Sequence, residues 1–421
     1  MAALIKIGNW LLFLYIMIIL SMVLELRLFM SQAVIWLLLT AIFTFRNSTF
    51  PFFTFSKAIK ENLLEFWKYK AFSVVIIFFL FVLLSGLWTP PNDIWLSKLR
   101  VRLPFLAMPF IFAWLPVISK KDYRLVFYIM ILVISVVSVG ILINYVLNFE
   151  VITESLRHGK NIPVPMNHIR FSLILGFSIC AGVLLYLDNF YLRYIWERKL
   201  ILGLSIFLFL TIHILSVRSG IVALYGTFSV LGFRYYIVKK KEYVKGLILG
   251  ASLLVIPIIA YLSLPSLQNK VKYSIYDYQQ FKAGNGADFS DSERFGSILV
   301  GMDIGNRYPF LGCGYGNIEK EISLTYQRVF PQENEYKIPH NQFVMTYATT
   351  GIVGVLILIF TFFFPIFYRK NYRDWFFLAF HCIIFCSLLV ESTLETQVGA
   401  LMYTFFLCLG LNSNKKALSN G

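Results

Sequence analysis

Twelve long apolar runs constrain this chain more than any other feature of its sequence. A bilayer core about 30 Å thick takes roughly 20 apolar residues as an α-helix. The runs lie at residues 8–25, 30–45, 71–88, 102–118, 124–147, 170–187, 200–216, 220–237, 246–264, 342–367, 375–390 and 397–411. Charged residues make up 14% of the chain, against about one quarter in soluble domains. We therefore predict an all-α polytopic membrane protein with about twelve transmembrane helices, and we exclude a soluble fold.

The distribution of positive charge predicts the orientation of these helices. If the N-terminus lies inside, the inside segments hold 22 of the 38 Lys and Arg residues, and the short outside loops hold 8. Short cytoplasmic loops carry such an excess of Lys and Arg. Both termini are therefore predicted to be cytoplasmic. The net charge of +16 is then a topology signal that also contacts anionic membrane lipids, and it does not indicate binding of nucleic acid.

The long segment 265–339 divides the chain into three parts. Residues 1–264 are predicted to hold transmembrane helices 1–9, residues 265–339 a large outside loop, and residues 340–421 the last three helices and a cytoplasmic tail. The loop is far longer than a connection requires, and such loops are usually functional or disordered. It has eight basic and nine acidic residues and is rich in Tyr and Gly, which favours a folded segment over a tail.

A helix is predicted inside this loop. Ser290 and Glu293 have the spacing of a capping box. Apolar residues then follow at helical spacing up to Gly305-Asn306, where the helix is predicted to end: Phe295, Ile298, Leu299 and Met302. Arg294 would then lie in the first turn of an amphipathic helix on the outer membrane surface.

Three basic residues, Arg218, Arg294 and His340, are predicted to lie on the outer membrane face. A cluster of positive charge at headgroup depth suits an anionic, lipid-linked substrate, because the planar guanidinium binds phosphate oxygens with two hydrogen bonds. His340 follows Pro339, a residue that favours the first position of a helix. A helix N-terminus disfavours the charged imidazolium, so His340 could act as a general base at neutral pH.

Each of these residues also has an ordinary explanation. Arg218 could be an interface anchor, as single arginines at the ends of transmembrane helices usually are. Arg294 could be a solvated first-turn residue, and His340 could simply cap its helix.

Other charged residues near the predicted helix ends are equally ambiguous. Arg170 is a further outside cation, and Glu391 and Glu395 could either pair with one of the arginines or face water. His213 and His381 lie inside apolar runs, where a hydrogen bond in the core is the better expectation. Four of the five cysteines also lie inside the runs, and no His, Cys and Asp cluster has metal-binding spacing. We therefore expect a metal-independent protein without a disulfide framework and without a cofactor.

Three short stretches, in this order, resemble motifs of the bacterial O-antigen ligase/polymerase superfamily. They are the turn Arg218-Ser219-Gly220; Arg294 followed by the Pro-x-x-Gly-x-Gly pattern within residues 308–317; and His340-Asn341-Gln342-Phe343 followed by the Gly-x-x-Gly pattern at 351–354. From the sequence alone, the alternate glycines suit a tight turn or a close approach of the backbone to a ligand. The resemblance covers about residues 165–400. Thr350 stands where many relatives carry an acidic residue, so no role of that acid is transferred to this chain.

The resemblance implies a GT-C-type glycosyltransferase of the bacterial inner membrane with a periplasmic active site. Its donor would be a glycan on undecaprenyl diphosphate, and its acceptor lipid A–core in an O-antigen ligase. A polymerase would use another lipid-linked repeat as acceptor, and a protein O-oligosaccharyltransferase would use Ser or Thr of a protein. The length, the twelve helices and the large loop favour the ligase.

The residues would support a single displacement that inverts the anomeric centre. His340 would accept the proton of the acceptor hydroxyl, and Arg218 and Arg294 would hold the diphosphate. The further residues expected to bind substrate are Arg170, His168, Asn341, Gly314 and Tyr315. A lipid-linked glycan transporter is the non-enzyme alternative. Transporters, however, usually place their polar groups near the bilayer midplane, whereas the candidate residues of this chain gather near one predicted face.

Overall fold

The computed structural model describes residues 2–45, 53–55, 66–282, 290–331 and 335–415. The elements of the first half are α1 (Ala2–Val23), α2 (Arg27–Ile42), β1 (Phe43–Phe45), β2 (Phe53–Phe55), α4 (Lys70–Leu84), η1 (Ser85–Leu87), α5 (Asp93–Trp114), α6 (Lys120–Leu147), α7 (Phe149–Arg157), α8 (His168–Leu187) and α9 (Trp196–Leu215). Those of the second half are α10 (Arg218–Gly232), η2 (Phe233–Lys239), α11 (Tyr243–Ser263), α12 (Pro265–Lys282), α13 (Ser290–Arg307), α14 (Ile318–Val329), α15 (Gln342–Phe367), η4 (Tyr368–Arg373), α16 (Trp375–Val390), η5 (Thr393–Glu395) and α17 (Gln397–Asn414).

Each of the twelve predicted apolar runs coincides with a helix, and the chain is a polytopic membrane protein. Within the described residues, seven helices are long and apolar enough to cross a membrane. They begin at Lys70, Lys120, His168, Trp196, Arg218, Tyr243 and Gln342. Three shorter apolar helices lie at Gly8–Val23, Arg27–Ile42 and Trp375–Val390. The helices α5 and α17 account for the two remaining runs but do not meet these criteria, so the prediction of about twelve spans is supported only in part.

Helix α5 begins nine residues before the run that was predicted to start at residue 102. Asn92 caps it, since its side chain accepts a hydrogen bond from the Trp95 N–H at 3.0 Å. The sequence predicted that Lys98, Arg100 and Arg102 belong to a short outside loop before this run. They lie instead within α5, so the predicted loop was wrong here.

The second apolar run does not stay helical to its predicted end at residue 45. Helix α2 ends at Ile42, and the chain continues into the short strand β1, which pairs antiparallel with β2. Phe43 lies opposite Phe55 in this pair. The described part of the chain is therefore helical with one small two-stranded sheet, rather than all-α.

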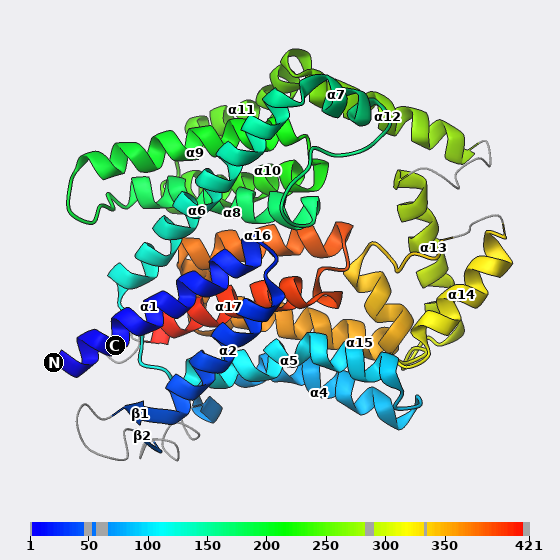
Figure 1. Ribbon diagram of the computed structural model, residues 1–421, viewed down its shortest axis with the longest axis horizontal. Coiled ribbons are helices and arrows are strands. Elements are labelled where there is room, and N and C mark those ends of the chain that lie inside the picture. The colour runs from blue at the N-terminus through cyan, green and yellow to red at the C-terminus, as the bar shows by residue number, and fades with distance from the viewer. Residues whose placement is uncertain (1, 46–52, 56–65, 283–289, 332–334, 416–421) are drawn as a thin grey trace.

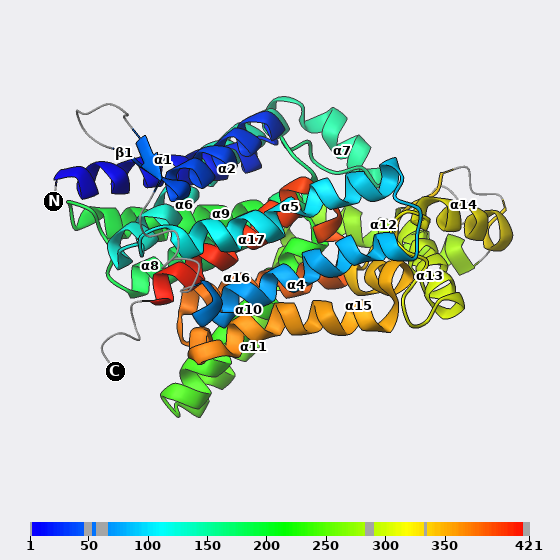
Figure 2. The ribbon, with the colours of Figure 1, turned by 90° about the horizontal axis from the view of Figure 1, so that it is seen from below.

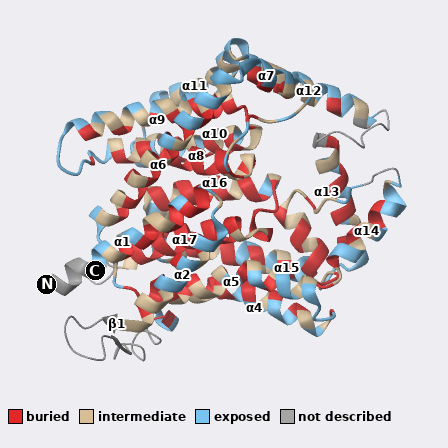
Figure 3. Cartoon of the chain, viewed as in Figure 1, coloured by how far each residue is buried: buried red, intermediate tan, exposed pale blue. Residues whose placement is uncertain are grey.

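The long helices lie side by side in one bundle, with α8, α16 and α17 at its buried centre (Figures 2 and 3). Helix α8 packs against α6, α9, α10 and α16, and α17 packs against α5. Both ends of the chain lie at one end of the bundle, and α7, α12, α13 and α14 lie at the other (Figure 1). The observed helices thus agree with the predicted folded segment between the ninth and tenth apolar runs.

The helices of this segment are joined to one another by polar contacts. The carboxylate of Asp277 on α12 is buried and accepts hydrogen bonds from the backbone N–H and the hydroxyl of Ser292 on α13. Arg307 on α13 donates to Glu321 on α14 at 2.7 Å. Helix α13 runs two residues further than the predicted end at Gly305. The predicted capping box cannot be compared with the structure, because only the backbone of Ser290 is described.

The predicted apolar stripe of α13 does not face the protein. Phe295 and Leu299 are each 51% exposed, while the opposite face buries Val300 and Ile304 against α14 and α15. Small residues on this opposite face, among them Gly301, allow α15 to approach closely. An outward apolar stripe agrees with the predicted amphipathic helix, and the location of this helix on the membrane surface stays a prediction.

Candidate functional site

His340 and Glu391 form the centre of the candidate site. The imidazole Nδ1 lies 3.2 Å from Oε2 of Glu391. His340 precedes α15 in a segment that is fixed to the turn after α16 by two further contacts. The Ser392 hydroxyl donates to the carbonyl of Pro339, and the Asn341 amide donates to the carbonyl of Leu389 at 2.9 Å. The histidine therefore has a fixed position opposite the carboxylate, although it belongs to no helix.

His340 was expected at the N-terminus of a helix that Pro339 begins; the structure places it just before that N-terminus, and Pro339 does not begin the helix. Helix α15 begins at Gln342, and its N-cap is Asn341, whose side-chain oxygen accepts from the N–H groups of Phe343 and Val344. Pro339 therefore lies outside the helix. His340 does not cap α15 either. Its environment is set by Glu391 rather than by exposed N–H groups of a helix.

Glu391 is surrounded by positive charge. Burial raises the pKa of its carboxyl, but the hydrogen bond from His340 and the charges of His340, Arg170 and Arg294 outweigh burial, and the pKa lies below its ordinary value. The carboxylate is therefore ionised at neutral pH. Glu391 had been predicted either to pair with an arginine or to face water; it instead pairs with a histidine and interacts electrostatically with two arginines.

Arg294 reaches this cluster from α13 and is coupled to His340 through one hydroxyl. Ser297 donates to the carbonyl of Arg294 at 2.8 Å and accepts from the backbone N–H of His340 at 3.2 Å. This contact joins the first half of α13 to the segment before α15. Two of the three predicted catalytic residues are thus brought together.

The N-terminus of α8 contributes His168 and Arg170. Asn167 caps this helix by accepting from the N–H groups of Ile169 and Arg170. His168 lies within electrostatic range of Arg294, Lys270 and Glu391. Arg170 is half-buried, and its Nε has no hydrogen-bond partner within the described part of the chain.

Arg218 is the first residue of α10 and lies at the same end of the bundle. Ser216, in a left-handed conformation with φ 54°, closes the short turn from α9. The guanidinium of Arg218 donates to the hydroxyl of Ser274 on α12. Ser274 in turn donates to the carbonyl of Lys270 at 2.9 Å. Arg218 is thus connected to the cluster through α12, by way of the lysine that lies near His168.

Lys270 positions α12 against the segment that follows α7. Its ammonium donates to the carbonyl oxygens of Gly159 at 2.6 Å and Lys160 at 3.2 Å. Nothing in the sequence had singled out this lysine, because its partners are more than 100 residues away. A lysine in a long loop has no local pattern that would reveal such a role.

A second ion pair lies four residues beyond Glu391. Arg102 of α5 pairs with Glu395, and the two side chains are 0% and 1% exposed. Arg102 also donates to the hydroxyl of Tyr315 at 2.8 Å, and its guanidinium lies 4.3 Å from the centre of that ring. The amide of Gln342, the first residue of α15, donates to Glu395 at 3.3 Å. The network joins α5, the glycine-containing loop (residues 308–317), the segment that carries His340 and the turn that carries Glu391.

The glycines that follow α13 pack against a break in α15. At Gly351 the backbone leaves the helical conformation, with φ 63°. The loop fills the break: the N–H groups of Cys313 and Gly314 donate to the carbonyls of Ala348 and Thr349, at 3.0 and 2.8 Å. In return, the N–H of residue 352 donates to the carbonyl of residue 309 at 2.8 Å.

The packing of this loop on α15 explains why glycine is required both in the loop and in the helix. A Cβ on Gly312 would overlap the backbone of Thr349, and one on Gly351 would overlap the backbone of Phe310. The close approach inferred from the sequence is thus made to α15. Tyr315 is fully buried beside Arg102. Direct contact of Gly314 and Tyr315 with a substrate stays a prediction.

The two histidines inside apolar runs have partners in the protein, as expected. The Nδ1 of His213 lies 2.7 Å from the carbonyl of Phe209, and its Nε2 lies 2.9 Å from the hydroxyl of Tyr225. The Nδ1 of His381 lies 2.7 Å from the carbonyl of Phe377. Neither histidine belongs to the candidate site.

Residues 203–359 match a protein-family model described as O-antigen ligase. No curated protein matches the chain. The matched segment includes Arg218, Arg294 and His340, while Glu391 and the N-terminus of α8 lie outside it.

Proposed function

We propose that this chain, whose residues 203–359 match a family model described as O-antigen ligase, transfers a glycan from undecaprenyl diphosphate to lipid A–core. The observation that carries the proposal is the His340–Glu391 pair, with Arg170 and Arg294 acting on the same carboxylate. It combines a base with the positive charge that a diphosphate leaving group needs. The membrane is the bacterial inner membrane, with both termini cytoplasmic and the site on the periplasmic face.

His340 is the general base. An ionised Glu391 accepts a hydrogen bond from the Nδ1–H of the imidazole, which leaves the lone pair on Nε2. A carboxylate that holds a histidine in this tautomer also stabilises the imidazolium that forms when the histidine takes a proton. Glu391 is therefore a positioning residue for His340.

The reaction is one displacement at the anomeric carbon. The acceptor oxygen forms a bond to that carbon while the bond to the diphosphate oxygen breaks, and the hydroxyl proton passes to Nε2 of His340. The lipid diphosphate leaves with the bonding electron pair, and the configuration at the anomeric carbon inverts. No metal or cofactor takes part in this scheme.

The cations bind and stabilise the leaving diphosphate. Arg294 and Arg218 are assigned to the phosphates, and donors fixed in place where charge develops are typically worth about 2.7–4 kcal/mol each. Arg170 is added to them, because its Nε–H has no partner among the described residues and could serve an anionic ligand. His168 and Asn341 are assigned to substrate binding near the same helix ends.

The experiment uses purified protein, a lipid-linked glycan and lipid A–core in detergent. Product formed without a sealed compartment supports transfer and excludes a transporter. The acceptor is identified by deleting the gene and running a glycan gel. Loss of polymer from lipid A–core, with lipid-linked polymer still made, supports the ligase. Single repeats on the core would instead indicate a polymerase, and loss of glycoprotein alone would indicate a protein O-oligosaccharyltransferase.

A further inference from the structure

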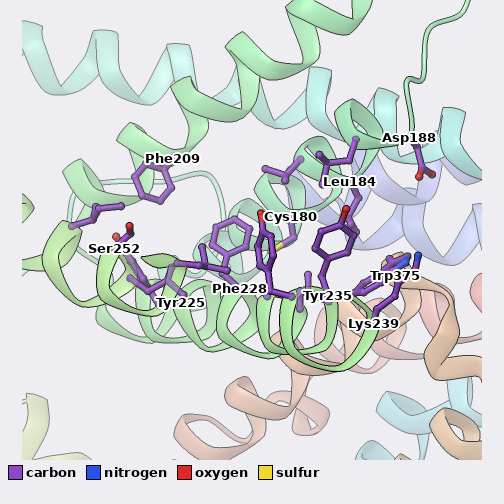
Figure 4. A pocket seen from close by; sticks show the side chains of 18 residues that line it. Cys180, Leu184, Asp188, Phe209, Tyr225, Phe228, Tyr235, Lys239, Ser252 and Trp375 are labelled. Atoms are coloured by element: carbon purple, nitrogen blue, oxygen red, sulfur yellow. The ribbon is translucent and has the colours of Figure 1, made fainter. Parts of the chain in front are cut away.

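A cavity of about 560 Å³ lies between α8, α10, η2 and α11, apart from the proposed transfer site. Its walls are mostly apolar and aromatic, with Phe209, Tyr225 and Phe228 among the side chains that line it (Figure 4). Lys239, Trp375 and Asp188 lie at one end of it, with Asp188 apart from the other two (Figure 4). The cavity is thus an apolar space with a polar end, enclosed by helices of membrane-spanning length.

The cavity lies in the half of the bundle remote from the glycan site. On α8 it is lined from Cys180 to the residue after the helix, whereas His168 begins that helix. On α10 it is lined from Tyr225 onward, whereas Arg218 begins that helix. The polar end of the cavity therefore lies toward the end of the bundle that carries the two termini (Figure 1).

Helix α11 gives the first reason to expect an occupant. It has the length and apolarity of a membrane span, but none of its residues is buried against the protein. Leu249, Ser252, Leu253 and Ile256 line the cavity at the spacing of one helix face. Helix α11 packs on α10 and η2, but part of its inward face borders the cavity, and the dispersion contacts of that part are missing.

The polar end of the cavity gives the second reason. Helix η2 is a π-helix, a rare form that occurs often at functional sites. Tyr235, Tyr236 and Lys239 of this segment all line the cavity, and the ammonium of Lys239 lies 5.9 Å from the ring of Trp375. Among the described residues that line the cavity, Asp188 is the one acid, and it is paired with Arg124 at 2.7 Å. The positive charge of Lys239 is thus not balanced by that acid.

We propose that this cavity binds one acyl chain of an anionic phospholipid, with the lipid phosphate at Lys239. The phospholipid comes from the leaflet at the end of the bundle that carries the termini. Its chain fills the space behind α11 and supplies the contacts that this helix lacks. The proposal does not depend on the transfer reaction.

The test maps the site with a photoreactive lipid. The full-length protein is placed in nanodiscs that contain phosphatidylglycerol with a diazirine in one acyl chain, and the cross-linked peptides are identified by mass spectrometry. We expect cross-links at residues 249–256 and 225–239. Unlabelled phosphatidylglycerol should compete better than phosphatidylcholine, by about fivefold, since one lysine near anionic lipid contributes roughly 1 kcal/mol.

Two variants and a control separate the acyl chain from the headgroup. Ser252→Trp fills the cavity and should abolish cross-linking at residues 249–256. Lys239→Gln should retain cross-linking but lose the preference for the anionic lipid. Lys240→Gln, a neighbouring lysine that does not line the cavity, should behave as wild type. Because Ser252→Trp could disturb folding, the result for Lys239→Gln stands as an independent test.

Three outcomes would overturn the proposal. Cross-links spread evenly over the outer surfaces of the helices would mean that the cavity is not a lipid site. An unchanged preference in Lys239→Gln would exclude this residue as the phosphate ligand. Competition by undecaprenyl phosphate but not by phosphatidylglycerol would show that the occupant is a polyprenyl chain rather than a phospholipid.

Discussion

Arg102 and Glu395 form an ion pair from which solvent is excluded. Arg102 is the tenth residue of α5, and Glu395 lies in the turn before α17. The same turn carries Glu391, the partner of His340. The buried pair is therefore well placed to fix the position of that turn and, through Gln342, the start of α15.

Removal of one member of this pair should destabilise the protein strongly. Arg102→Ala leaves the buried carboxylate of Glu395 unpaired, and breaking such a pair typically costs about 3–5 kcal/mol. We expect a marked fall in the temperature of unfolding in detergent. The double variant Arg102→Met, Glu395→Leu should be closer to wild type, because it leaves no charge unpaired. Equal loss in the single and double variants would show that the ion pair itself is not responsible.

The contribution of Glu391 to stability should depend on pH in one direction. Its pKa in the folded protein lies below the ordinary value, so its stabilising contacts are fully present above the ordinary carboxyl pKa of about 4.3 and are lost as the pH falls from there through the lower folded pKa. We expect the difference in unfolding temperature between wild type and Glu391→Gln to be constant from about pH 6 to 8 and to shrink below about pH 4. A difference that disappears between pH 8 and 6 would contradict the ionised carboxylate.

The arginines assigned to the diphosphate should affect the rate of transfer more than folding. Arg294→Ala and Arg218→Ala should each reduce turnover by about 10²–10³, since each removes a fixed positive charge from the leaving group. Arg170→Ala should act mainly on the apparent affinity for the lipid-linked donor. Arg328→Ala is the matched control, because this exposed arginine pairs only with Asp303 among the contacts described. Wild-type turnover of Arg294→Ala would remove this residue from the mechanism.

The docking of the glycine-containing loop onto α15 predicts that small substitutions there are costly. Gly351→Ala places a Cβ against the backbone of Phe310 at a positive φ, and the backbone strain alone costs about 1–3 kcal/mol. We expect lower thermal stability and faster proteolysis near residues 308–317. The control is Gly203→Ala in α9, where a Cβ would meet nothing within 4 Å. Equal stability of the two variants would argue against the docked loop.

The sequence predicted the helices well because a transmembrane helix is encoded by a contiguous apolar run. It failed where a charge lies inside such a helix. The predicted run began only at Arg102 and left out the charged first turns of α5, although the charge of Arg102 is neutralised by Glu395, almost 300 residues away. The sequence pattern also predicted, wrongly, that Pro339 begins a helix. The capping of α15 by Asn341 depends on the geometry of the segment before it, which the pattern does not show.

The candidate site was predictable only in part. Arg294 and His340 were found from local motifs, and the structure links them through Ser297. Glu391 could not be assigned to His340, because their pairing joins residues 51 positions apart. The packing of the glycine motif on α15 could not be predicted for the same reason, because only the fold brings the motif to the break at Gly351.

The rate of transfer by purified His340→Ala tests the central claim most directly. The assay uses a lipid-linked glycan and lipid A–core in detergent, with His158→Ala as the control, an exposed histidine near Glu154 on α7. We expect His158→Ala to match wild type and His340→Ala to fold normally but to lose transfer by about 10²–10⁴, the range for removal of a general base. Wild-type transfer by His340→Ala would contradict the account.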